Sequence, residues 1–100
     1  MKIIDKAAWQ IDGGVPEESV VKHFQNIFLW LDLHDMLTDE GKEELNDGID
    51  NSASLNEDLI TYEALNFLDK HYDTYISSIE YGGDPKCKGL DTLYANYSKR

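Results

Sequence analysis

Hydrophobic residues recur at helical spacing along much of the chain, most clearly between Ser19 and Leu37. Residues three, four and seven positions apart share one face of an α-helix, so the spacing predicts a helix at about 17–35. A second apolar set falls partly outside the main stripe, which makes this helix apolar over more than half of its circumference. Such a helix must be covered on several sides, and we expect it to lie buried at the centre of the fold. The main stripe holds Val20, Phe24, Ile27, Phe28 and Leu31, and the second set holds Val21, Leu29, Trp30 and Leu33.

Local signals predict where other helices begin and end. Thr38 and Thr61 suit the N-cap position, because a threonine hydroxyl accepts a hydrogen bond from the first turn and acidic residues follow each of them. They predict helices at 39–47 and about 62–79, and Gly48 suits the end of the first. The remaining expectations are a short helix at 2–12, a loop at 48–58, and a final short helix that carries Leu90, Leu93, Tyr94 and Tyr97 and frays at 98–100.

These elements predict an all-α fold with little or no sheet. One hundred residues suffice for one domain with a modest hydrophobic core, so we expect a single domain over 1–100. It would be a small bundle of about four to five helices around the buried central helix (about 17–35), which packs on the long helix (about 62–79). Residues from about 82 onward would form a tail that can be mobile.

Negative charge is concentrated in the middle third of the chain. The formal net charge is −11, and residues 32–63 hold eleven acidic side chains against Lys42 alone. Acidic residues at 40, 43, 44 and 47 would share one helix face, where like charges four residues apart cost about 0.2–0.5 kcal/mol per pair. Two interpretations stay open, a solvated face that keeps the protein soluble or a surface that meets a positively charged partner. The candidate partner-binding residues are Asp39, Glu40, Glu43, Glu44, Asp47, Asp50, Glu57 and Asp58.

All six tyrosines lie in the second half of the chain. Tyrosine suits positions with one apolar and one wet side, so most should cap the edges of the core. Tyr81, Tyr94 and Tyr97, near the C-terminal end, are secondary candidates for an interface.

No pattern indicates a catalytic centre, a cofactor or a dedicated metal site, and we expect a protein that is not an enzyme. His23 and His34 would lie about 16 Å apart on the central helix, too far to share one zinc ion. The acidic segment also fails the pattern of a calcium-binding loop. Cys87 stands between Lys86 and Lys88, which should lower the pKa of its thiol, but the sequence pairs no base with it. A free loop thiol is the simpler interpretation.

Membrane and nucleic-acid partners are disfavoured. The longest apolar run, 27–31, is far shorter than the ~20 residues of a membrane span, and residues 1–12 lack the apolar core of a signal peptide. A single cysteine permits no internal disulfide. We therefore expect a cytoplasmic protein. Direct binding to nucleic acid would need a basic patch, and the basic residues form none.

Residues 15–79 contain the runs WLDLHDMLTDEG and LITYEALNFLDKHYDTYI. Together with the chain length, the acidity and the helical pattern, these runs resemble the small immunity proteins of bacterial toxin–immunity systems. The resemblance implies an inhibitor that neutralises a cognate toxin, often a nuclease, by docking an acidic face on its basic active-site region. It assigns a role to no individual residue. Two alternatives remain, a phage-type or accessory regulator that mimics DNA toward a nucleic-acid-binding protein, and a non-catalytic homo-oligomeric module whose acid serves solubility.

Overall fold

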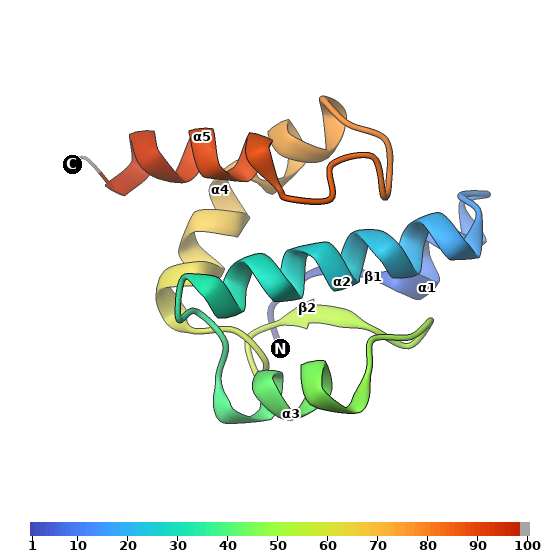
Figure 1. Cartoon of the computed structure of the whole chain (residues 1–100), viewed down its shortest axis with the longest axis horizontal. Helices are drawn as coiled ribbons and strands as arrows, with labels where there is room; N and C mark the ends of the chain where they lie inside the picture. The colour runs from blue at the N-terminus through green and yellow to red at the C-terminus, as the bar shows by residue number, and fades with distance from the viewer. Residues whose placement is uncertain (99–100) are drawn as a thin grey trace.

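The computed structural model describes residues 1–98, which form five helices and one two-stranded antiparallel sheet (Figure 1). Residues 99–100, at the end expected to fray, lie outside the described residues. The fold is mainly helical, as predicted, but the sheet means that it is not strictly all-α. In chain order the elements are β1 (Ile3–Lys6), α1 (Ala7–Asp12), α2 (Glu17–Leu33), α3 (Asp39–Asp47), β2 (Ser54–Asn56), α4 (Tyr62–Ser77) and α5 (Lys88–Ser98).

The sheet corrects two predictions made from local pattern. Residues 2–12 are a strand followed by a helix, not one helix, and the expected loop at 48–58 contains β2. Ile3 pairs with Asn56, and the register shifts before Asp5. Isoleucine suits a strand when a partner strand is present, but that partner lies some fifty positions further along the chain. Local periodicity carries no information on such a pairing.

α2 crosses the middle of the molecule, with α3 on one side and α5 on the other (Figure 1). Its main stripe is buried, and α4 packs against it through ring contacts between His23 and Tyr72 and between Trp30 and Phe67. The helix ends at Leu33, two residues before the expected boundary. A left-handed residue follows the C-cap, since Asp35 has a φ of 54°.

The second apolar set of α2 is only partly covered. Trp30 is buried, but the side chain of Leu29 is 47% exposed and that of Leu33 is 85% exposed. α2 is covered on several sides, as expected, by α1, α3, α4 and α5, but this cover leaves Leu29 and Leu33 exposed. Leu33 and about half of Leu29 therefore face solvent.

Both predicted threonine caps are confirmed. The Thr38 hydroxyl accepts a hydrogen bond from the Gly41 amide at 3.1 Å, and the Thr61 hydroxyl accepts one from the Ala64 amide at 3.3 Å. α3 ends at Gly48 as expected, and α4 ends at Ser77, two residues early. Cap chemistry is local, which explains why the sequence located these helix starts.

α5 closes the fold over the end of α2 that carries Trp30. Leu90 is fully buried, and the Trp30 indole N–H donates to Asp91 Oδ1 at 2.6 Å. Within residues 1–98, no helix combines the length and the apolar character needed to cross a membrane.

Candidate functional site: an acidic surface beside an apolar groove

α3 carries most of the candidate partner-binding residues and is held in place by backbone contacts with residues 58–60. The Thr38 amide donates to the Leu59 carbonyl at 3.0 Å, and the Thr38 hydroxyl donates to the Asp58 carbonyl at 2.7 Å. Gly41 is buried against the same segment, and a Cβ at this position would stand 2.1 Å from the Leu59 carbonyl oxygen. The close approach needs glycine and brings Asp58 next to the N-terminal turn of α3.

All eight candidate carboxylates are exposed, and we call them together the acidic surface. Among residues 1–98, the ion pairs are Lys2–Asp69, His34–Asp91 and Lys42–Asp35, so none of the eight carboxylates is paired with a cation. Lys42, the one base in the acidic third, reaches Asp35 at 3.8 Å instead. The members of the acidic surface are Asp39, Glu40, Glu43, Glu44, Asp47, Asp50, Glu57 and Asp58.

Two members of the acidic surface have partners within the fold. The Asp50 carboxylate accepts hydrogen bonds from the Ser52 hydroxyl at 2.5 Å and the Ser52 amide at 2.8 Å, and these hold the pKa of Asp50 below its ordinary value. The Glu57 carboxylate accepts from the Lys2 backbone amide beside the sheet. Asp50 therefore stays charged at lower pH, while Glu57 is the member least available to a partner.

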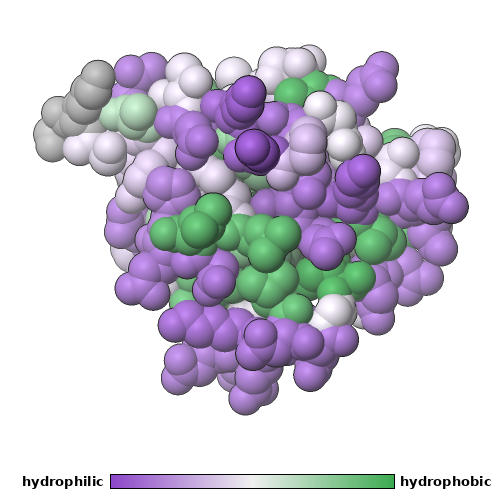
Figure 2. Space-filling view, in the orientation of Figure 1, coloured by the Kyte–Doolittle hydropathy of each residue, from purple (hydrophilic) through white to green (hydrophobic). Residues whose placement is uncertain are grey.

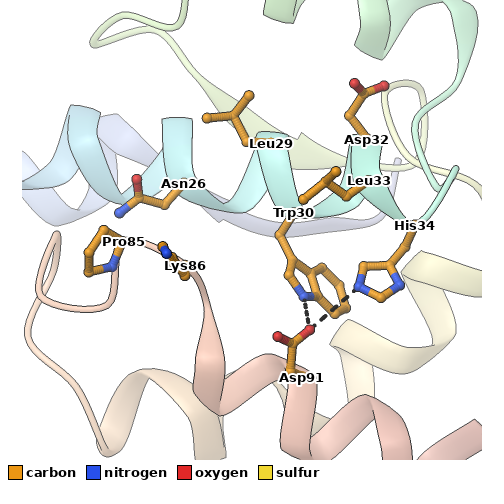
Figure 3. A pocket seen from close by; sticks show the side chains of 9 residues that line it. All are labelled: Asn26, Leu29, Trp30, Asp32, Leu33, His34, Pro85, Lys86 and Asp91. Carbon is orange, nitrogen blue, oxygen red and sulfur yellow. Dashed lines mark hydrogen bonds and ion pairs between the residues drawn. The ribbon is translucent and has the colours of Figure 1, made fainter.

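An apolar band runs along α2, between the hydrophilic side chains of α3 and those of the loop that leads to α5 (Figure 2). Within it lies an open groove of about 580 Å³, bounded by α2, by Pro85 and Lys86 of the loop, and by the start of α5. Leu29 and Leu33 rise at its edge, and the buried face of Trp30 forms its floor (Figure 3).

Three polar side chains at the groove, Trp30, His34 and Asp91, are engaged with one another. Asp91 Oδ1 accepts the Trp30 indole N–H and lies 3.5 Å from His34 Nε2, so Asp91 ties α5 to the end of α2 (Figure 3). Asp32 and Lys86 are exposed at the groove and have no ion pair among residues 1–98. The groove thus offers apolar surface between a free carboxylate and a free ammonium.

The three secondary candidates are largely used within the fold. The Tyr81 hydroxyl donates to Asp5 Oδ2 at 3.0 Å, and the Tyr94 hydroxyl donates to Glu63 Oε1 at 2.6 Å. Tyr97 is half-buried, with its ring 5.3 Å from that of Phe67. These positions match the expected role of tyrosine at the edges of the core, and a role in an interface stays a prediction.

The most polar part of the interior was not predicted. Asp5 and His23 are each only 2% exposed, and Tyr72 connects them. The Tyr72 hydroxyl donates to Asp5 Oδ2 at 2.6 Å and lies 2.9 Å from His23 Nε2. Gln10 and the Lys6 amide donate to the other carboxylate oxygen, at 2.9 and 2.8 Å. The only signal in the sequence was a carboxylate among the apolar residues 3–8, which is weak.

Burial determines the protonation of this network. It lowers the pKa of His23 to about 4, although the charge of Asp5 acts in the opposite direction. Burial, assisted by Asp5, also raises the pKa values of Tyr72 and Tyr81 above the ordinary range of a phenol. A neutral imidazole therefore donates to Tyr72, and both hydroxyls keep the protons that they donate to Asp5. The network links β1, α2 and α4, and its burial points to a structural role.

Cys87 is a free thiol, as expected, but the expectation that its pKa is lowered is wrong. Its thiol is fully buried, and burial raises its pKa to about 12, which outweighs any effect of the lysines on either side. Lys86 and Lys88 are exposed, and the charge of Lys88 acts on Asp84. Cys87 ends the loop before α5 and belongs to the hydrophobic core, so it is not a reactive thiol.

The histidines lie in three separate surroundings. His23 belongs to the buried network, His34 faces Asp91, and the ring of His71 makes a tilted contact with Phe67 and an edge contact with Tyr97. Within residues 1–98, no three His, Cys, Asp or Glu side chains converge in a way that could hold a metal ion.

Compared with models of protein families, with curated proteins and with solved structures, the chain gives no match.

Proposed function

We propose that this protein is a non-catalytic inhibitor that binds a basic protein partner through the acidic surface, as an immunity protein neutralises a toxin in the cytoplasm. The observation that carries the proposal is that five of the eight exposed carboxylates lie on α3 and that none of the eight has an ion pair among residues 1–98. The cognate partner would be a toxin, and a nuclease fits well because its active site must carry cations that bind phosphates.

The electrostatics support a role in recognition over one in solubility alone. Clustered like charges destabilise the folded state through their mutual repulsion. The same charges attract a basic surface over a distance of about 10 Å at an ionic strength near 0.1 M. Complementary charge raises the association rate and selects against acidic or neutral proteins.

The contacts that hold α3 against the rest of the fold also support the proposal. The threonine cap and the close contact of Gly41 with Leu59 hold the helix backbone, so the positions from which the carboxylates of α3 project are fixed relative to one another. A preorganised surface loses less entropy on binding than a mobile one. Such a surface could cover the cationic cleft of a partner and exclude its substrate.

Co-purification from the native host, followed by an activity assay, tests the proposal. The tagged full chain is used as bait at low and at high salt, and retained proteins are identified by mass spectrometry. We expect a strongly basic protein that is released at high salt and whose activity is lost on addition of one equivalent of the inhibitor. The variant Glu40→Gln/Glu43→Gln/Glu44→Gln should bind the partner about tenfold more weakly, mainly through slower association.

A matched control removes the same amount of charge elsewhere. Asp12, Asp73 and Glu80 are exposed and lie outside the acidic surface, so the variant Asp12→Asn/Asp73→Asn/Glu80→Gln should bind nearly as the natural chain does. Equal loss of affinity in the two triple variants would mean that net charge, not the acidic surface, determines binding. Retention of no basic protein by the natural chain would refute the proposal.

A further inference from the structure

The exposed leucines of α2 require a separate explanation from the carboxylates of α3. Leu33 is 85% exposed and Leu29 is 47% exposed, and both border the groove (Figure 3). Single apolar residues at a surface are common, but two of them beside a groove form a contiguous apolar patch. The volume of about 580 Å³ lies within the range of roughly 300–1,000 Å³ found for binding pockets.

The shape of the groove suits a helix. Asn26, Leu29, Trp30 and Leu33 are spaced 0, 3, 4 and 7 along α2, so they line one face over about 10 Å of helix axis. That length corresponds to two helical turns, the distance between the first and last anchors of an amphipathic helix that lies in an apolar groove. Trp30 is fixed by its hydrogen bond to Asp91, so the floor of the groove is already formed without a ligand.

Charge around the groove selects the occupant. Negative charge lies on two sides of the groove. Asp32 is exposed at the groove, and Asp35 follows just beyond the end of α2. The hydrophilic side chains of α3 border the apolar band (Figure 2). Lys86 is the one lysine or arginine that lines the groove among residues 1–98, and the other basic side chain there, His34, faces Asp91. A second copy of this chain would bring a further net charge of −11 to the same place, which disfavours self-association.

We propose that the groove receives the apolar face of a basic amphipathic helix of the partner protein, with one or two aliphatic side chains over Trp30 and lysines or arginines toward Asp32 and the acidic surface. This inference rests on the proposed function, since it supplies the apolar anchor for the same basic partner. The carboxylates accelerate and select the encounter, and burial of Leu29 and Leu33 slows dissociation.

A synthetic peptide of about 18 residues, long enough to form a helix, serves as the probe. It carries leucine on one helical face and lysine elsewhere. Two comparison peptides keep one feature each, one with glutamate in place of lysine and the other with serine in place of leucine. Binding to the full chain is measured by titration calorimetry, and the binding site is mapped from backbone amide chemical shifts.

We expect only the leucine–lysine peptide to bind with measurable heat and to shift the amides of the second half of α2. The variant Leu29→Ser/Leu33→Ser should weaken its binding about tenfold or more, because the two exposed leucines supply the apolar contact. Tyr62→Ser is the matched control, since Tyr62 is 78% exposed and lies outside the groove, and it should leave the affinity unchanged.

Several outcomes would overturn the inference. Equal affinity for the glutamate peptide would show an apolar site without preference for a basic helix, and equal affinity for the serine peptide would show attraction by charge alone. A dimer of the natural chain in sedimentation that is abolished by Leu29→Ser/Leu33→Ser would identify a second copy as the occupant.

The affinity of the basic partner protein for two variants of the full chain separates this inference from the proposed function. Suppose that Glu40→Gln/Glu43→Gln/Glu44→Gln weakens binding of the partner and Leu29→Ser/Leu33→Ser does not. Docking in the groove is then refuted, and docking through the acidic surface stands. If only the leucine variant weakens binding, the groove stands and docking through the acidic surface is refuted.

Discussion

Acidification should destabilise the fold through one residue, His23. Its imidazole is buried between α2 and α4, donates to Tyr72 and is neutral in the folded protein. Protonation would place a second proton and a positive charge in a site that water does not reach. Because burial dominates over the attraction of Asp5, the folded pKa is about 4, compared with 6.5 for an ordinary histidine.

The size of the effect follows from these two pKa values. Between about pH 6.5 and pH 4 the unfolded chain binds a proton that the folded protein does not, so the free energy of unfolding falls as the pH falls. A difference of 2.5 units corresponds to about 3 kcal/mol in total, and about 2 kcal/mol of this is lost by about pH 5. The contribution is complete above about pH 6.5. A loss of this size is a large share of the 5–15 kcal/mol that stabilises a typical domain.

Urea unfolding, followed by tryptophan fluorescence to which the buried Trp30 contributes, measures the free energy of unfolding from pH 7 down to pH 4. Carboxylates also titrate over part of this range, so His23→Gln is the reference, because it keeps an N–H donor but does not titrate there. The natural chain should lose about 3 kcal/mol more than the variant. The ring resonances of His23 give its pKa directly in the natural chain, whether or not the variant folds. Parallel stability curves, or a pKa of His23 near 6.5, would refute the described burial and its consequence.

Two further predictions concern packing. Gly41→Ala should destabilise the protein by about 1–3 kcal/mol despite the better helix propensity of alanine, because its Cβ would lie 2.1 Å from the Leu59 carbonyl oxygen. Thermal unfolding tests this against Asn46→Ala, an exposed change in the same helix, and a Gly41 variant as stable as the natural chain would contradict it. Cys87 should resist a thiol reagent at about pH 8 in the folded protein and react at once in denaturant, since a rise of the pKa from 9.0 to about 12 lowers the thiolate fraction about a thousandfold. Rapid labelling of the folded protein would show that the thiol is accessible.

Only one part of the candidate site, the acidic surface, could be predicted from the sequence. The cluster of carboxylates could be located because charge density and helix phase are read directly from residue types and spacing. The groove could not be located from the sequence, although Leu29 and Leu33 belong to the second apolar set of the central helix. Whether an apolar residue on a helix is covered depends on which other elements reach it, and α5 covers Trp30 but stops short of the two leucines.

By itself the sequence determined what local chemistry decides: the course of α2, the starts of α3 and α4 at their threonine caps, and the concentration of negative charge in the middle third. Only the tertiary structure decided the pairing of β1 with β2, the burial of Asp5 and Cys87, and the exposure of Leu33. Helix caps and periodicity act over a few residues, whereas strand pairing and solvent exposure depend on segments far apart in the chain. The reactivity of a thiol or an imidazole follows from its burial, and for that reason a neighbouring lysine in the sequence was a poor guide to Cys87.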